Sequence, residues 1–160
     1  MDKDRLEDKI TKIVRFLEQN TQTISFAESC TGGQIASAFT AIGGVSSVFN
    51  GSCVTYSNEI KHRWLGVNES IFIEFGAVSI ECVSEMLDGI SRFASSDYAI
   101  AVSGIAGSTG GSDEKPVGTV YIGILTPHGK IIHRYHFDGD RNSVQNSATY
   151  TAIELLERNL

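Results

Sequence analysis

The spacing of apolar residues switches repeatedly along this chain between that of a helix and that of a buried strand. Residues 3–20 carry apolar side chains at helical spacing, which predicts an amphipathic helix. Residues 23–27 then form a short apolar run typical of a buried strand, and the same change recurs from residues 79–94 to residues 97–103. This alternation predicts an α/β fold, because each apolar helix face has to be buried against a sheet.

The same reading places the remaining elements. Further helices are expected over 32–42, 58–65 and about 144–155, and further strands over 53–56, 118–125 and 130–137. The last two strands are joined by Thr126-Pro127-His128-Gly129, which predicts an antiparallel hairpin. We therefore predict one three-layer α/β/α domain over residues 1–160, with a mixed, mostly parallel sheet and one antiparallel hairpin.

Length and charge exclude several classes of protein. A chain of 160 residues favours one domain, and its net charge of −6 lacks the basic footprint of a nucleic-acid binder. No apolar run approaches the length of a membrane span, and the N-terminus has no apolar signal core, so we expect no membrane partner. The three cysteines are odd in number and lack CxxC spacing, which favours a reducing cytoplasm and no zinc site.

Residues 27–33, Ala-Glu-Ser-Cys-Thr-Gly-Gly, join a strand end to a helix start. The N–H groups at such a start can bind an anion, either a phosphate or a developing oxyanion. Ser29 is then a candidate nucleophile, and the alternative is that a Ser or Thr here only caps the helix. The Cys30 thiol is a second candidate, since a thiol near a helix start can have a lowered pKa.

Residues 54–61 place a lysine at the start of another helix. If Asn58 is the N-cap, Lys61 lies near the third helical position, where the helix dipole disfavours a cation. A lysine whose charged form is disfavoured can act as a base. The alternative is an ordinary surface lysine.

Two later segments could bind a substrate. The glycine-rich run 103–111 follows a strand but no helix follows it, so it is not a Walker A loop; it lines a pocket or is a flexible loop. Asp140 can cap the last helix, and Arg141 in its first turn needs an anionic partner, either a substrate phosphate or a carboxylate. The four histidines have no metal-binding spacing, so we expect no metal.

Six runs in this order resemble the family of the CinA C-terminal domain, whose stand-alone members are nicotinamide-nucleotide amidases. The runs are AESCTGG at 27–33, VTYSN with Lys61 at 54–61, GAVS at 76–79, DYAIAVSGIAG at 97–107, GGSDEKPVGTV at 110–120 and GDR at 139–141. The resemblance covers nearly the whole chain and implies a single α/β/α domain. It also implies hydrolysis of nicotinamide mononucleotide to nicotinate mononucleotide and ammonia, in pyridine nucleotide recycling, without metal or cofactor.

Carried over by position, the resemblance implies that Ser29 is the nucleophile, Lys61 its general base and Tyr56 an assisting residue. The residues expected to bind the nucleotide are Cys30, Thr31, Gly32, Gly33, Asn58, Ser103, Gly104, Gly107 and Arg141. Oxyanion donors are expected among the N–H groups of residues 31–33 or at the turn of Ser103 and Gly104. We expect a homo-oligomer, a dimer or larger, as is common for small α/β domains.

The chain departs from the family pattern at three places. Ser108 stands where the family usually has proline, and Ser52 stands where it commonly has glycine. Gln145 stands where an arginine usually follows GDR by four residues, one helical turn beyond Arg141. Loss of that charge is expected to weaken substrate binding and supports the alternative of a nucleotide-binding module with little catalysis, although the residues Ser29, Lys61 and Tyr56 are all present. The residues also leave room for a hydrolase that depends on Cys30 or for a non-enzymatic scaffold.

Overall fold

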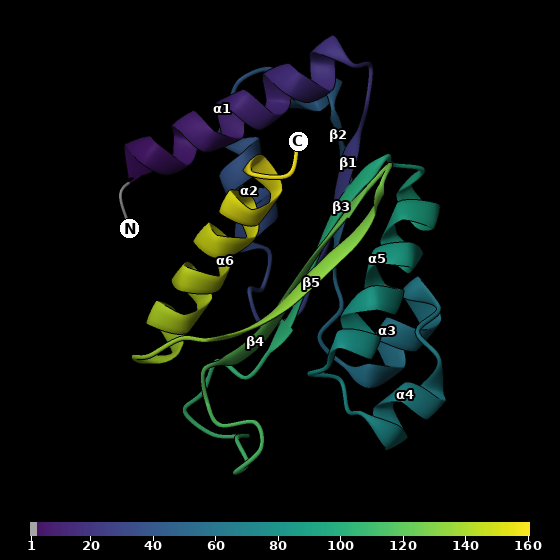
Figure 1. The fold of residues 1–160 in the computed structure, drawn as a ribbon, viewed down its shortest axis with the longest axis vertical. Helices are drawn as coiled ribbons and strands as arrows, with labels where there is room; N and C mark the ends of the chain where they lie inside the picture. The colour runs from purple at the N-terminus through teal and green to yellow at the C-terminus, as the bar shows by residue number, and fades with distance from the viewer. Residues whose placement is uncertain (1–2) are drawn as a thin grey trace.

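A five-stranded mixed sheet crosses the middle of the molecule in a computed structural model that describes residues 3–160 (Figure 1). The strands are β1 (Ile24–Glu28), β2 (Phe49–Val54), β3 (Tyr98–Gly104), β4 (Thr119–Thr126) and β5 (Gly129–His136). Their order is β2-β1-β3-β4-β5; β1 pairs in parallel with β2 and β3, whereas β3–β4 and β4–β5 are antiparallel. The predicted mixed sheet and its antiparallel hairpin are therefore confirmed.

Helices cover both faces of this sheet, as Figure 1 shows. One face carries α1 (Lys3–Gln19), α2 (Gln34–Thr40) and α6 (Arg141–Glu157). The other carries α3 (Asn58–Leu65), α4 (Glu69–Glu74) and α5 (Ile80–Ala94). A short 3₁₀ turn, η1 (Val45–Ser47), precedes β2. The arrangement is the predicted three-layer α/β/α domain. None of the helices within residues 3–160 is both long and apolar enough to cross a membrane.

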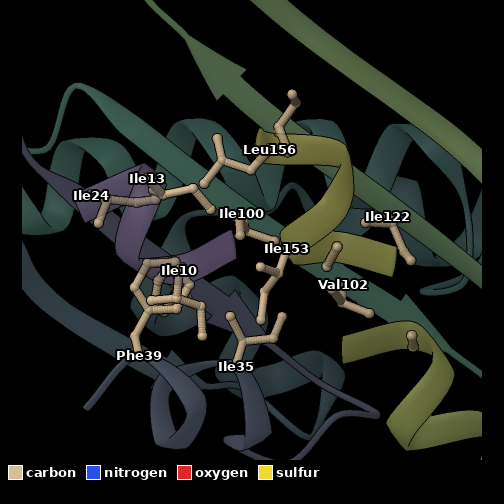
Figure 2. Packing of buried hydrophobic residues seen from close by; sticks show 14 of the residues in the cluster. Ile10, Ile13, Ile24, Ile35, Phe39, Ile100, Val102, Ile122, Ile153 and Leu156 are labelled. Carbon is tan, nitrogen blue, oxygen red and sulfur yellow. The ribbon is translucent and has the colours of Figure 1, made fainter. Parts of the chain in front are cut away.

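Two apolar cores lie on opposite faces of the sheet. The larger one packs α1, α2 and α6 on the sheet, and Figure 2 shows Ile10, Phe39, Ile100 and Ile153 meeting there. The smaller one packs α3 and α5 on the other face, where Met86 and Leu87 are fully buried. Because β3 is covered on both faces, its burial is nearly continuous along the strand, which explains the apolar run in its sequence.

Three local features differ from the sequence prediction. β2 begins at Phe49, four residues before the predicted start at 53, because this edge strand is only half-buried and its polar residues hide the apolar signal. The N-cap of α3 is Ser57, whose Oγ accepts the N–H of Ile60; Asn58, expected as the cap, is the first helical residue. Neither α4 nor η1 was expected.

Candidate active site

The parallel strands β1, β2 and β3 end at one edge of the sheet, where open α/β sheets bind ligands. A cavity of about 270 Å³ lies there. Nine of the residues expected from the sequence line it: Ser29, Cys30, Tyr56, Asn58, Lys61, Ser103, Gly104, Gly107 and Arg141. Three others, Thr31, Gly32 and Gly33, lie outside its lining. Among the described residues that line the cavity, Lys61 and Arg141 are basic and none is acidic.

The Lys61 amine and the Ser29 hydroxyl meet in this cavity. Lys61 Nζ donates to Ser29 Oγ at 3.1 Å and to the Thr55 carbonyl oxygen at 2.7 Å. Ser29 directly follows β1, and Lys61 stands in the first turns of α3 behind the Ser57 cap. The carbonyl uses one N–H of the amine, so the lone pair of a neutral Lys61 is left to accept the Ser29 hydroxyl proton.

Burial governs the protonation of Lys61. Its side chain is 2% exposed, and this burial lowers its pKa, against a smaller opposing influence from the Cys82 and Cys30 thiols. Within residues 3–160, Lys61 forms no ion pair with a carboxylate that would restore its charged form. A buried amine without a counter-ion favours the neutral state, which is the state a general base requires. The alternative of an ordinary surface lysine is wrong.

Glu28 occupies the helix start that the sequence suggested as an anion site. Its carboxylate is fully buried and accepts the N–H groups of Gly33, Ile35 and Ala36 at 3.0, 3.2 and 2.9 Å. Thr31 Oγ1 also donates to it at 2.7 Å, and the Gly32 N–H donates to the Ser29 carbonyl oxygen. The N–H groups of Gly32 and Gly33 therefore already have acceptors and are not free to bind an anion.

Of the donors predicted at residues 31–33, the Thr31 N–H has no acceptor within residues 3–160, and two further N–H groups lie near Ser29. Within residues 3–160, the Cys30 N–H donates to no backbone carbonyl oxygen. The Ile105 N–H donates to Thr119 on β4; since N–H groups alternate in direction along an antiparallel strand, the Gly104 N–H faces the β1 side. Ser29 lies on that side, because its own N–H donates to the Val102 carbonyl oxygen at 3.1 Å. A side chain at Gly104 would meet Val120 Cγ2 at 2.7 Å, so only glycine fits here.

Arg141 reaches the cavity from the first residue of α6, behind the Asp140 cap. Its guanidinium donates to the Gly107 carbonyl oxygen and, at 2.6 Å, to the Tyr56 hydroxyl. Both partners are neutral, and within residues 3–160 no carboxylate pairs with Arg141. The carboxylate partner considered from the sequence is therefore absent from the described residues, and the charge of Arg141 is available to an anionic ligand.

The Tyr56 side chain is 61% exposed at the rim of the cavity, where it contacts Arg141. Among the hydrogen bonds of residues 3–160, none joins Tyr56 to Ser29 or Lys61. Ser103 is buried, and its hydroxyl donates to the Ala77 carbonyl oxygen at 2.8 Å, so it fixes a cavity wall.

The Cys30 thiol is buried, which raises its pKa to about 12. Such a thiol stays protonated at neutral pH, contrary to the lowered pKa considered from its place near a helix start. Its carbonyl oxygen accepts Gln145 Nε2 at 2.7 Å.

Sequence reasoning missed Glu28 as a structural part of the site, although it stands inside AESCTGG. An acidic residue at the end of a fully buried strand was the signal available, because buried carboxylates need several donors. It also missed Ala77 and Val78 as lining residues, whereas residues 103–107, 109 and 110 line the cavity, as one of the two interpretations of the glycine-rich run predicted. A second, larger groove of about 600 Å³ runs along α6 and contains none of the expected site residues. Within residues 3–160, no group of three or more metal-ligating side chains could hold a metal ion.

Comparison with known proteins shows which family this chain resembles. The model of the CinA C-terminal domain matches residues 6–160. A CinA-like protein of Fervidobacterium nodosum is 49% identical over 92% of this chain, and one of Thermotoga neapolitana is 41% identical over 100% of it. These alignments cover 36% and 38% of the relatives, so the chain spans little more than a third of their length.

Solved structures are similar to this chain over nearly their whole length. Competence damage-inducible protein A from Klebsiella pneumoniae superposes with a TM-score of 0.92 at 35% identity, covering 96% of this chain and 95% of that one. A competence-damaged protein (CinA) superfamily protein from Escherichia coli superposes with a TM-score of 0.95 at 30% identity, covering 100% and 93%. The chain therefore belongs to the family of the CinA C-terminal domain.

Proposed function

We propose that this chain is an amidohydrolase that converts nicotinamide mononucleotide to nicotinate mononucleotide and ammonia, in pyridine nucleotide recycling. The observation that carries the proposal is the contact of 3.1 Å between Ser29 Oγ and Lys61 Nζ, a buried amine with a lowered pKa. A hydroxyl beside a neutral amine is the pairing that an activated serine nucleophile needs. The implied family activity and the cavity at the strand ends agree with this chemistry.

The first half of the reaction forms an acyl-enzyme. Neutral Lys61 takes the proton of Ser29, and Ser29 Oγ bonds to the carboxamide carbon. The oxyanion that develops would be held by the N–H groups of Cys30 and Gly104, and one such donor is typically worth about 3 kcal/mol. Protonated Lys61 then gives its proton to the amide nitrogen, the C–N bond breaks and ammonia leaves.

The second half repeats these steps with water. Lys61 takes a proton from the water, whose oxygen bonds to the acyl carbon. The tetrahedral intermediate collapses, nicotinate mononucleotide leaves and Ser29 regains its proton from Lys61. The positive pyridinium ring makes the amide electrophilic, so one base and two N–H donors are a sufficient apparatus.

Substrate binding would depend on the charge of the cavity. A phosphate suits Arg141, whose guanidinium has only neutral partners within residues 3–160. The Tyr56 hydroxyl accepts from Arg141 and so would orient it, while its assistance in proton transfer stays a prediction. A cytoplasmic location and a homo-oligomeric state also stay predictions from the sequence.

Product analysis tests the proposal. The protein is incubated with nicotinamide mononucleotide, and nicotinate mononucleotide and ammonia are quantified together. Equal amounts of both products, formed at a rate proportional to the protein, are expected. A rise in melting temperature with the nucleotide but without either product would instead support a nucleotide-binding module.

A further inference from the structure

One hydrogen bond connects the second turn of α6 to the residue that follows Ser29. Gln145 Nε2 on α6 donates to the Cys30 carbonyl oxygen at 2.7 Å, across 115 positions of the chain. Gln145 is half-buried and does not line the cavity. Its amide therefore contacts the backbone beside the nucleophile without facing the space in which a substrate would lie.

The segment that Gln145 contacts is a tight turn over residues 29–32, which is called the nucleophile turn below. The Gly32 N–H donates to the Ser29 carbonyl oxygen at 3.0 Å, so Cys30 and Thr31 are its two central residues. The Ser29 N–H donates to Val102, which fixes the start of the turn to β3. The central peptide, between Cys30 and Thr31, is the unit that rotates when a turn changes type.

Gln145 is the contact that holds this central peptide. Because a peptide unit is planar, holding the Cys30 carbonyl oxygen also fixes the Thr31 N–H, which has no acceptor of its own within residues 3–160. Rotation of this peptide changes the backbone angles of Cys30, and the neighbouring Ser29 Oγ would then move relative to Lys61.

The backbone of α6 at Gln145 is linked to α2 through Thr149. Thr149 is 2% exposed, and its hydroxyl contacts the Gln145 carbonyl oxygen at 2.9 Å and Gln34 Oε1 at 3.0 Å. Gln34 is the first residue of α2, which follows the nucleophile turn. One helical turn earlier on α6, Arg141 contacts Gly107 and Tyr56 at the cavity. One side of α6 therefore contacts both the nucleophile turn and residues that line the cavity.

We propose that Gln145 is a positioning residue, whose amide N–H on the Cys30 carbonyl oxygen holds the nucleophile turn so that Ser29 Oγ points at Lys61. The proposal rests on the Ser29–Lys61 chemistry proposed above. It requires that a donor at this position affects the reactivity of Ser29 and leaves the affinity for the substrate unchanged.

Two substitutions remove the donor. Gln145→Glu keeps the shape and replaces the amide nitrogen by oxygen, and Gln145→Met keeps the length without a charge. In both, kcat for nicotinamide mononucleotide is expected to fall about three- to tenfold, as for the loss of one buried hydrogen bond, with KM within about twofold. Asn146→Asp is the matched control, since it makes the same amide-to-acid change at the next, exposed residue.

A second measurement does not depend on the natural substrate. A fluorophosphonate probe phosphonylates serine nucleophiles: Ser29 Oγ bonds to phosphorus, fluoride leaves and Lys61 takes the serine proton. The labelling rate, followed by intact mass spectrometry, is expected to fall in both Gln145 variants and to stay at the wild-type value in Asn146→Asp. Gln145→Arg keeps N–H donors on a side chain long enough to reach the Cys30 carbonyl oxygen, so it is expected to retain most of the wild-type labelling rate.

The outcomes separate the two proposals. If the wild type labels at Ser29 without hydrolysing the nucleotide, and the Gln145 variants label more slowly, the proposed function fails and the positioning role stands. If Gln145→Met labels at the wild-type rate, the positioning role is overturned. It is also overturned if the Gln145 variants show a raised KM with an unchanged kcat. If wild-type Ser29 neither labels nor turns over substrate, Ser29 is no nucleophile and both proposals fall. Melting temperatures of all variants show whether a slower rate reflects unfolding.

Discussion

Lys61 Nζ lies 3.1 Å from Ser29 Oγ, although 32 positions separate the two residues in the chain. Their meeting follows from the topology, because β1 and β2 are parallel neighbours and the segments that follow them leave the sheet at the same edge. The Thr55 N–H donates to the Glu28 carbonyl oxygen at 2.8 Å, which brings those two segments together. The amine is buried by this arrangement, and its burial gives it the protonation state that the proposed chemistry needs.

The buried amine should make stability depend on pH. Burial lowers the pKa of Lys61 below its usual 10.5, so between the folded pKa and 10.5 the unfolded chain binds a proton that the folded chain has released. Stability then rises with pH in that window, and below the folded pKa the cost of burying the amine is constant. Lys61→Met removes this contribution. The free energy of unfolding of the wild type should therefore increase relative to that of the variant as pH rises.

Urea unfolding at about pH 7 and about pH 10 checks this, because other lysines titrate equally in both proteins and cancel in the difference. A pH-independent difference for Lys61→Met would mean that the pKa of Lys61 is not lowered in the folded protein.

Replacement of Arg141 should weaken binding of the phosphate. In Arg141→Met, KM for nicotinamide mononucleotide is expected to rise at least about tenfold, because hydrogen bonds between charged groups contribute about 1.5–3 kcal/mol. The same variant should treat nicotinamide riboside, which lacks the phosphate, much as the wild type does. Steady-state kinetics with both substrates measure this, and an equal loss on both would place Arg141 elsewhere than on the phosphate.

The Cys30 thiol should be dispensable for catalysis. Burial raises its pKa to about 12, so no thiolate is available at neutral pH. Cys30→Ala is expected to retain most of the wild-type kcat, and brief treatment with iodoacetamide should leave the wild-type rate unchanged. An inactive Cys30→Ala beside an active Ser29→Ala would instead identify the thiol as the nucleophile.

Glu28 should contribute to stability more than any exposed acid. Glu28→Gln places an amide N–H₂ against backbone N–H donors that the carboxylate now accepts. The free energy of unfolding is expected to fall by about 1–3 kcal/mol, the usual cost of leaving a buried donor unsatisfied. Urea unfolding measures it against Glu74→Gln, an exposed position where no change is expected. Equal stability of the two variants would show that the amide finds new partners.

Much of this fold could be predicted from the chain because its cores impose strong periodic patterns. The hairpin of β4 and β5 was predicted to within one residue, since its turn at Pro127 and His128 separates two strand-like runs. The helix α4 has no buried residue and so leaves no apolar periodicity to detect. The half-buried edge strand β2 was found only in its last residues for the same reason.

The sequence predicts those site residues whose role requires a reactive or charged side chain. It does not predict the contacts that depend on how the helices pack. Ser29, Lys61 and Arg141 are reactive or charged, so their motifs indicate a function. Whether the Gly33 N–H is free depends on the Glu28 carboxylate, and whether the Gly32 N–H is free depends on the turn that brings it to the Ser29 carbonyl oxygen; both depend on the angle at which α2 leaves β1. The bond between Gln145 and Cys30 likewise depends on how α6 packs, which no local pattern specifies.

The most direct test of the central claim is the rate of ammonia release from nicotinamide mononucleotide by the wild type, Ser29→Ala and Lys61→Ala, measured side by side with EDTA present. The account predicts turnover by the wild type and a loss of at least ~100-fold in each variant, because each removes the nucleophile or its base. Wild-type turnover that survives in Ser29→Ala or in Lys61→Ala would contradict it.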